Sequence, residues 1–294
     1  MGYKMLWKIR MLLKLIAVKF YQKFPHLISD EKYSKLLYRI VFGRKIDLNN
    51  PKTFNEHIIV SKLDDKKYTY AKYTDKYEVR AYVKNKVGDY ILNDVYGIYN
   101  SFDEIDFDSL PNSFALKATH ASGFNIIVTD KKTFDKAQAK KKFDRWLKTN
   151  FYYKDREKNY KNISPRILCD KYIEFSQNLV EYKLYCFYGR VKLICQNITI
   201  NDRRFTNVYD EYFNPIPVKW GYENLQYSLT ELKAELIGIS EKLAGEFDFV
   251  RVDLYENDGK IIFSELTFHS GGGLVPFKPA KYDIEFGRFF EGKK

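Results

Sequence analysis

The chain has 294 residues, of which 45% are hydrophobic and 17% aromatic, and this composition excludes disorder as its main state. Fifty Lys and Arg residues against 38 acidic residues give a formal net charge of +12. We therefore expect an anionic partner such as a nucleotide, an acidic glycan, a nucleic acid or a membrane surface.

Residues 1–24 carry six basic residues and no acidic residue. At 100° per residue, one apolar face is formed by Leu6, Ile9, Leu13, Ile16 and Phe20. Trp7, Met11 and Val18 fall on the other side. Lys14 interrupts the apolar run well short of the ~20 residues that span a membrane, and no small-residue cleavage site is present. We expect a basic amphipathic helix that either packs on the body of the protein or lies on an anionic membrane at its inner face.

Residues 25–110 are expected to form a mainly helical lobe. Its first helix has Ser29 or Asp30 as N-cap and Gly43 as its stop. A second helix is expected to begin at Asn50, with Pro51 in its first turn. A third helix is expected to end at Gly88.

After residue 90, short β-type runs separated by turns alternate with two helical stretches, 132–150 and 229–247. The chain is therefore expected to be α+β. We divide this part into a central unit, residues 111–175, and a C-terminal lobe, residues 176–294. The cysteines are few and form no Cys-x-x-Cys pair, which argues against a disulfide framework and favours a reducing cytoplasm: Cys169, Cys186 and Cys195.

Residues 249–267 predict a hairpin with charged residues on one face. Arg251 and Asp253 share a face of the first strand, and Glu265 and Thr267 share a face of the second. The hairpin should bring the two carboxylates side by side, where Mg²⁺ could join them. A surface Arg–Asp–Glu pairing across the sheet would give the same pattern. If the carboxylates hold a metal, replacing either one should stop turnover and leave the fold intact.

Three other segments carry candidate site residues. Residues 113–128 predict a strand, a small-residue turn and a strand, with Lys117 between apolar neighbours. Such a turn can cradle phosphate, although an ordinary hairpin with a solvent-facing lysine looks the same. Residues 166–173 predict a strand that enters a hinge. Residues 181–192 predict a hairpin with Lys183 and Lys192 on facing strands.

The order of these features resembles the ATP-grasp superfamily and, within it, the TupA-like family of teichuronopeptide biosynthesis. The resemblance spans residues 25–290 and rests on the segments PKTFNE, DKYEVRAYV, LPNSFALKATHASG, YKNISPRIL and FVRVDLYENDGKIIFSELTF. It implies two α+β lobes that clasp ATP, with two Mg²⁺ ions.

The resemblance also implies a role for individual residues. The expected cofactor-binding residues are Arg80, Lys117, Gly123, Asn125, Asp170, Tyr172, Ile173 and Lys192. The expected metal ligands are Asp253, Glu265 and Thr267. The expected catalytic residues are Arg251, Lys183 and His269. His269 is a candidate general base, while a loop or structural role remains the alternative for it and for His120.

The implied reaction activates a carboxylate as an acyl phosphate, which an amine then attacks. The expected substrates are an anionic carbohydrate carboxylate of the uronic-acid type and an amine, in the assembly of a surface polysaccharide. No nucleic acid partner is expected, because the positive charge is concentrated in the first 60 residues. Since the catalytic motifs all lie after residue 75, removing residues 1–24 should leave the chemistry unaffected.

Two other enzyme classes fit the same features. A glycosyltransferase would share the anionic substrate and the metal, and such enzymes often use an Asp-x-Asp motif. Another phosphoryl transfer on the same fold would share the ATP site. The product formed from ATP separates the ligase from both.

Overall fold

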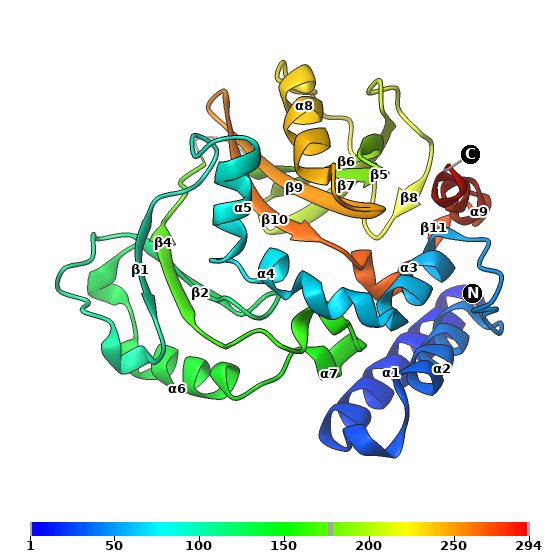
Figure 1. Cartoon of the computed structure of the whole chain (residues 1–294), viewed down its shortest axis with the longest axis horizontal. Coiled ribbons are helices and arrows are strands. Elements are labelled where there is room, and N and C mark those ends of the chain that lie inside the picture. Colours follow the sequence, from blue (N-terminus) through cyan, green and yellow to red (C-terminus); the bar gives the residue numbers. More distant parts are fainter. Residues whose placement is uncertain (1, 176–178, 293–294) are drawn as a thin grey trace.

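The computed structural model of the chain describes residues 2–175 and 179–292. As predicted, the first part is helical (Figure 1). Its helices are α1 (Gly2–Lys23), α2 (Asp30–Phe42), α3 (Phe54–Leu63), α4 (Ala71–Thr74) and α5 (Val79–Lys86). The later helices are α6 (Lys136–Leu147), α7 (Tyr152–Asp155), α8 (Lys233–Ala244) and α9 (Lys281–Gly287).

Helix α2 has the predicted caps and helix α3 does not. At α2, the Ser29 side chain accepts a hydrogen bond from the Lys32 backbone, and Gly43 ends the helix at φ 74°. The prediction for α3 is wrong because Asn50 precedes the helix. Thr53 is the N-cap and forms a reciprocal capping box with Glu56, which satisfies two backbone N–H groups at once.

A four-stranded antiparallel sheet forms one lobe, on the left of Figure 1. Its order is β1-β4-β2-β3, and its strands are β1 (Val95–Tyr99), β2 (Phe114–Ala118), β3 (Asn125–Val128) and β4 (Ile167–Lys171). Helix α6 packs on it through Ala139 and Phe143. Strand β1 precedes residue 111, so the expected division at that residue cuts through this sheet.

A five-stranded antiparallel sheet forms the other lobe, in the order β10-β9-β5-β6-β7. Its strands are β5 (Leu179–Phe187), β6 (Arg190–Ile200), β7 (Arg203–Asp210), β9 (Phe249–Asn257) and β10 (Lys260–Thr267). Two-residue turns with positive φ, such as Asp258-Gly259 at 50° and 72°, join its hairpins. A short pair, β8 (Lys219–Trp220) and β11 (Phe277–Lys278), lies outside it. The sequence did not predict β1, β7, β8 or β11.

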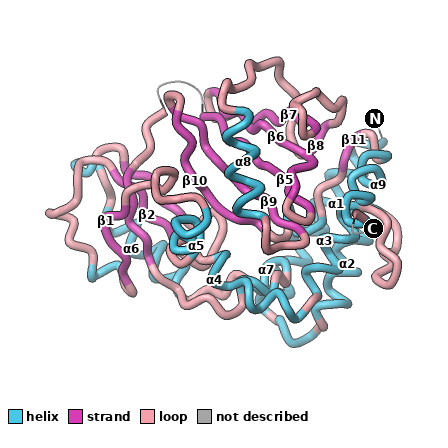
Figure 2. The backbone as a smooth tube through the Cα atoms, turned by 45° about the horizontal axis from the view of Figure 1, so that its top comes forward, coloured by secondary structure: helices cyan, strands magenta, loops and turns pink. Residues whose placement is uncertain are grey.

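The two faces of the large sheet have different partners. Helix α8 covers one face, where Leu236 and Leu243 share a core with Val252 of β9 (Figure 2). On the other face, Phe54 of α3 packs edge-on against Phe249 of β9. Alternate residues of a strand point to opposite faces, so Arg251 and Asp253 follow Phe249 on the α3 side. The charged residues therefore begin where this aromatic core ends.

Helix α1 packs along α2 and α7 at the edge of the molecule (Figure 1). Its packed face is the one with Trp7, Met11 and Val18, which contact the core of α2. The apolar face noted in the sequence is exposed instead. Within residues 2–175 and 179–292, no helix is both long and apolar enough to cross a membrane.

Candidate active site

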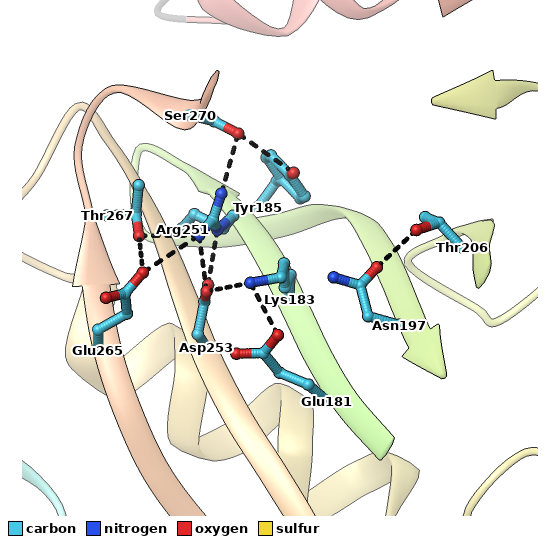
Figure 3. Close-up of polar contacts among 10 residues, drawn as sticks. All are labelled: Glu181, Lys183, Tyr185, Asn197, Thr206, Arg251, Asp253, Glu265, Thr267 and Ser270. Carbon is cyan, nitrogen blue, oxygen red and sulfur yellow. Dashed lines mark hydrogen bonds and ion pairs between the residues drawn. The ribbon is translucent and has the colours of Figure 1, made fainter. Parts of the chain in front are cut away.

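Three adjacent strands of the large sheet bring the predicted charged residues together (Figure 3). In the register of β9 and β10, Asp253 lies opposite Glu265, and Arg251 lies opposite Thr267. On the other side of β9, Lys183 of β5 lies opposite Asp253. The predicted hairpin and its carboxylate pair are therefore confirmed in position.

A β-bulge sets this pairing. From the turn as far as Phe263, which pairs with Leu254, the hairpin register is regular. The register then shifts between Phe263 and Glu265, so that Ser264 is the extra residue. If the register continued without the bulge, Ser264 would lie opposite Asp253, and Glu265 would lie opposite Val252 and point to the other face of the sheet.

Asp253 is fully buried and is held by two cations. Its Oδ1 accepts a hydrogen bond from Arg251 Nε at 2.6 Å. Its Oδ2 accepts from Arg251 Nη2 and from Lys183 Nζ, each at 2.6 Å. Burial alone would raise the pKa of Asp253, but the attraction of Arg251 and Lys183 outweighs it and holds that pKa below its usual range. Asp253 is therefore ionised.

Lys183 is the second cation of this cluster. Burial and the nearby Arg251 would lower its pKa, but Asp253 and Glu181 outweigh both effects and raise it. Glu181 lies 2.9 Å from Lys183 Nζ, and its own pKa is raised by burial. The sequence placed Glu181 in this hairpin without giving it a role.

Arg251 links the sheet to the loop that follows β10. Its Nη2 donates to Thr267 Oγ1 at 2.9 Å and lies 3.4 Å from Glu265 Oε1. Its Nη1 donates to Ser270 Oγ at 3.1 Å. The Thr267 hydroxyl in turn donates to Glu265 Oε1 at 3.0 Å. One guanidinium thus fixes the geometry of the carboxylates and of the loop.

A second site lies on the small sheet, where Lys117 of β2 forms an ion pair of 2.7 Å with Asp170 of β4. Both residues line a pocket of about 150 Å³ between the two sheets, with Arg80, Gly123, Asn125 and Ile173. Asp170 is buried, and its Oδ1 has no hydrogen-bond partner among the described residues. The expected cofactor-binding residues that line this pocket therefore come from four separate segments of the chain.

Lys76 also lines this pocket, and the sequence analysis did not select it. Its ammonium group donates to the backbone oxygen of Ala121, in the turn after β2. Burial lowers the pKa of Lys76. Lys76 and Arg80 both follow Asp75 closely, so nothing in the sequence separates their roles. Arg80 donates from Nη2 to the backbone oxygen of Asn93 at 2.7 Å.

Two predicted cofactor-binding residues do not line this pocket, namely Tyr172 and Lys192. Tyr172 belongs to the segment after β4, where Ile173 lines the pocket instead. Lys192 lies on β6, and its Nζ donates to Glu211 Oε1 at 2.9 Å. Since Cys195, not Lys192, is opposite Lys183, the two lysines lie on facing strands but out of register.

A larger pocket, of about 540 Å³, adjoins the first at Glu265, which lines both. Arg251, Thr267 and His269 line it on one side, and Met11, Lys14, Leu15 and Val18 of α1 line it on another. Asp155 and Glu157 add acidic groups to its wall. The two pockets thus meet at a carboxylate that the sequence singled out.

His269 is buried beside two oxygen acceptors. Its Nδ1 lies 3.0 Å from Asn159 Oδ1 and 3.7 Å from Glu157 Oε2, so Nδ1 carries the proton and Nε2 the lone pair. Nε2 has no hydrogen-bond partner among the described residues. Burial lowers the pKa of His269 and keeps the ring neutral. His120 lines neither pocket and contacts the Trp146 backbone oxygen through Nε2 at 3.0 Å.

The family model TupA-like ATPgrasp matches residues 56–291. The chain belongs to this family. The match confirms the resemblance, the ATP-grasp fold and the ATP-grasp enzyme class expected from the sequence. No curated protein matches the chain in sequence.

Solved structures similar to this TupA-like chain include two ligases at low sequence identity. The L-amino acid ligase of Bacillus licheniformis is 14% identical at a TM-score of 0.46, over 74% of this chain and 50% of that one. The D-alanine–D-alanine ligase of Helicobacter pylori is 15% identical at a TM-score of 0.41, over 76% of this chain and 61% of that one. The TupA-like chain thus spans less than two thirds of either relative.

The expectation that the chain has no Asp-x-Asp motif of the glycosyltransferase kind is wrong, because Asp106 to Asp108 form one such stretch. It lies in an exposed turn, where the Asp108 backbone donates to Asp106 Oδ1 at 3.1 Å. Phe107 between them is buried in the core of the small sheet. The stretch lines neither pocket, and the hydrogen bond from the Asp108 backbone gives the Asp106 side chain a local structural role.

Proposed function

We propose that the protein is an ATP-dependent carboxylate–amine ligase that works through an acyl phosphate. The observation that carries the proposal is the position of Glu265, which lines both pockets. A phosphate chain that enters from the first pocket would meet an acceptor in the second at this residue. Transfer of a phosphoryl group needs such a junction, with cations on both sides of it.

The first pocket suits a nucleotide. Lys76, Arg80 and Lys117 supply positive charge for phosphate oxygens. The unpartnered Asp170 Oδ1 can accept a hydrogen bond from an adenine amino group. Ligand pockets usually measure ~300–1,000 Å³, so ATP would fill this smaller one and extend past Glu265 into the second.

The donor set at the junction also suits Mg²⁺. Glu265 and Thr267, which line the second pocket, offer hard oxygen atoms, which Mg²⁺ prefers. Asp253, the third expected ligand, is fully buried and lines neither pocket, and both of its oxygens already accept hydrogen bonds from Arg251 or Lys183, so in this arrangement it orients Arg251 and does not face a metal. In the described part of the chain, no cluster of three or more His, Cys, Asp or Glu side chains could hold a metal. A Mg²⁺ held by one or two carboxylates and by substrate phosphates fits this arrangement. When bound, it would neutralise charge on the phosphate oxygens.

The chain's own residues have distinct tasks in the proposed reaction. A substrate carboxylate oxygen attacks the γ-phosphorus and ADP leaves, while Arg251 faces the charge that moves. The amine nitrogen then attacks the acyl carbon and phosphate leaves. Neutral His269, with its Nε2 lone pair, takes the proton that the amine loses.

The second pocket supports a charged, polar acceptor pair. Lys14 and Lys154 can bind a carboxylate, and Asp155 and Glu157 can bind an ammonium group. Its volume, about 540 Å³, accommodates a sugar acid together with an amine. The family resemblance favours a uronic-acid-type carboxylate and an amino acid, in the assembly of a surface polysaccharide.

Product analysis tests the proposal. The enzyme, Mg²⁺ and ATP are incubated with uronic acids and a panel of amino acids, and nucleotide, phosphate and the amide are measured. We expect ADP, phosphate and amide in equal amounts, only when both acceptors are present. Glu265→Gln serves as the inactive control. ADP with a phosphorylated sugar and no amide would indicate phosphotransfer, and glycoside formation without ATP cleavage would indicate a glycosyltransferase.

A further inference from the structure

The exposed side of α1 is the most apolar surface of the described chain. Of the sixteen exposed large hydrophobic side chains, ten lie between Met5 and Leu27. Six of them form one stripe along α1, each 47% to 58% exposed: Leu6, Ile9, Leu12, Leu13, Ile16 and Phe20. A continuous apolar stripe on a helix marks an interaction surface, whereas exposed apolar residues scattered singly do not.

The opposite side of α1 is already occupied. Trp7, Met11 and Val18 pack against the core around α2, and Arg156 Nη2 donates to the backbone oxygen of Tyr21 at 3.4 Å. The helix is therefore fixed on the body by one side, and turning it to bury the stripe would break these contacts. The stripe is left for a partner outside the chain.

The charges beside the stripe indicate the chemistry of that partner. At 100° per residue, Lys8 and Lys19 border the stripe on one side and Lys23 follows its C-terminal end, and all three are exposed. The first 24 residues include no acidic residue. An apolar stripe bordered by lysines is the pattern of a helix that lies in the headgroup region of a bilayer. Lysine side chains there reach anionic headgroups while their methylene groups stay in apolar surroundings.

We propose that α1 binds an anionic membrane surface through this stripe. A helix of 22 residues would lie along the surface for about 33 Å. Met11, Lys14, Leu15 and Val18 of the same helix line the second pocket. The pocket would therefore lie about one helix diameter, ~10 Å, from the bilayer. If the proposed ligase function is right, a lipid-linked acceptor could enter it there.

This placement changes the sequence-based expectation for removal of residues 1–24. Because α1 forms a wall of the second pocket, a truncated protein would lose part of that pocket as well as the stripe. Single substitutions on the exposed side of the full chain separate the two effects.

The test is co-sedimentation of the full-length protein with vesicles of phosphatidylcholine alone or mixed with phosphatidylglycerol. We expect binding only to the mixed vesicles, and release as salt rises from ~0.1 M to ~1 M, because the Debye length falls from ~10 Å to ~3 Å. Leu13→Glu should weaken binding at least about 10-fold, since it places a charge in the apolar layer. Its matched control, Ile127→Glu, changes a side chain of similar exposure on β3 and should bind as wild type does.

A charge series provides a second measurement. Replacing Lys8, Lys19 and Lys23 with Gln should weaken binding about 100-fold, since each lysine near an anionic surface contributes about fivefold. The same change at Lys132, Lys141 and Lys148, which are exposed on the other lobe, should leave binding unchanged.

Three results would overturn the proposal. The first is that the protein pellets equally with both vesicle types, or with neither. The second is that Leu13→Glu binds vesicles as wild type does. The third is that the protein forms a dimer in solution that does not bind vesicles and that Leu13→Glu dissociates. The last result would assign the stripe to a second copy of the chain. None of these measurements depends on turnover, so they fail or succeed independently of the proposed ligase activity.

Discussion

The two charged clusters at the candidate active site are built differently. On the large sheet, Asp253 has both oxygens hydrogen-bonded to Arg251 or Lys183, and it is fully buried. On the small sheet, Lys117 holds only one oxygen of Asp170, and the other has no partner in the described chain. The first cluster is complete without a ligand, whereas the second leaves a hydrogen bond for one.

The difference shows where stability and binding are separable. A cluster that is satisfied in the free protein contributes to folding, and its loss affects both fold and function. A cluster completed by a ligand contributes mainly to binding. Four substitutions test whether the two clusters differ in this way.

We expect the largest effect from Asp253→Asn. The substitution leaves Arg251 and Lys183 buried with less opposing charge, so the free energy of unfolding should fall by about 3 kcal/mol. Turnover should be lost as well. This differs from the sequence-based expectation of an intact fold, because the sequence does not show that Asp253 is buried. Urea unfolding measures the change, and a stability equal to wild type would contradict the cluster's role in folding.

Glu265→Gln should separate activity from stability on the same sheet. Glu265 has a side chain 32% exposed, and its contact with Arg251 is 3.4 Å. The free energy of unfolding should therefore change by less than about 1 kcal/mol. ADP formation should fall about 100-fold or more, because a charge at the junction of the pockets is removed. Near-normal ADP formation would remove Glu265 from the proposed active site.

Lys117→Met should act mainly on nucleotide binding. Mg-ATP at about 100 times its Kd should stabilise the wild-type fold by ~2.7 kcal/mol. The variant should lose most of this gain, because Lys117 lines the pocket proposed for the nucleotide. Without nucleotide, the free energy of unfolding of the variant should be only about 1 kcal/mol below that of wild type. The Lys117 side chain is 27% exposed, so solvent partly screens its ion pair with Asp170. Thermal unfolding with and without Mg-ATP measures both effects, and an undiminished shift would contradict the assignment.

A graded effect, with no loss of stability at neutral pH, is expected from His269 as pH falls. Burial lowers the pKa of His269 in the folded protein, while the unfolded chain has a pKa near ~6.5. Above pH ~6.5 the ring is neutral in both states, and its contribution to stability is complete. Below it the unfolded state binds the proton first, so stability falls by up to about 1.4 kcal/mol per pH unit until the folded pKa is reached.

The control for this pH dependence is His269→Gln. Its unfolding free energy should fall less steeply below pH ~6.5, with a residual slope from His57 and His120, whose pKa values are also lowered by burial. An unchanged slope would show that His269 takes up its proton equally in the folded and unfolded states.

The strands and the hairpin of the candidate site were predictable from local pattern. Alternation placed Arg251 and Asp253 on one face, and Asp258-Gly259 specified a two-residue turn. The bulge at Ser264 was not predictable, because it depends on how β10 packs against the rest of the fold. That single extra residue decides whether Glu265 faces Asp253.

The remaining differences also concern contacts between distant segments. The sequence did not separate Lys76 from Arg80, because only the Ala121 turn, 45 residues away, shows which side chain reaches it. It did not place Lys192 beside Glu211, because the register of β6 is set by its neighbours on both sides. The start of helix α3 is a local exception: its first residue is Phe54, because the capping box of Thr53 and Glu56 outcompetes a cap at Asn50.

The fold class, the family and the residue types of the site could be predicted from local patterns, because periodicity, turn residues and motif order are local properties of the chain. Tertiary contacts were needed to show which charges are buried, which pocket each residue lines and which side of α1 is free. Burial and pocket geometry depend on contacts between residues far apart in the chain, and a local pattern does not encode those contacts. The exposed stripe of α1 follows from such contacts, because the body of the protein packs against Trp7, Met11 and Val18 instead.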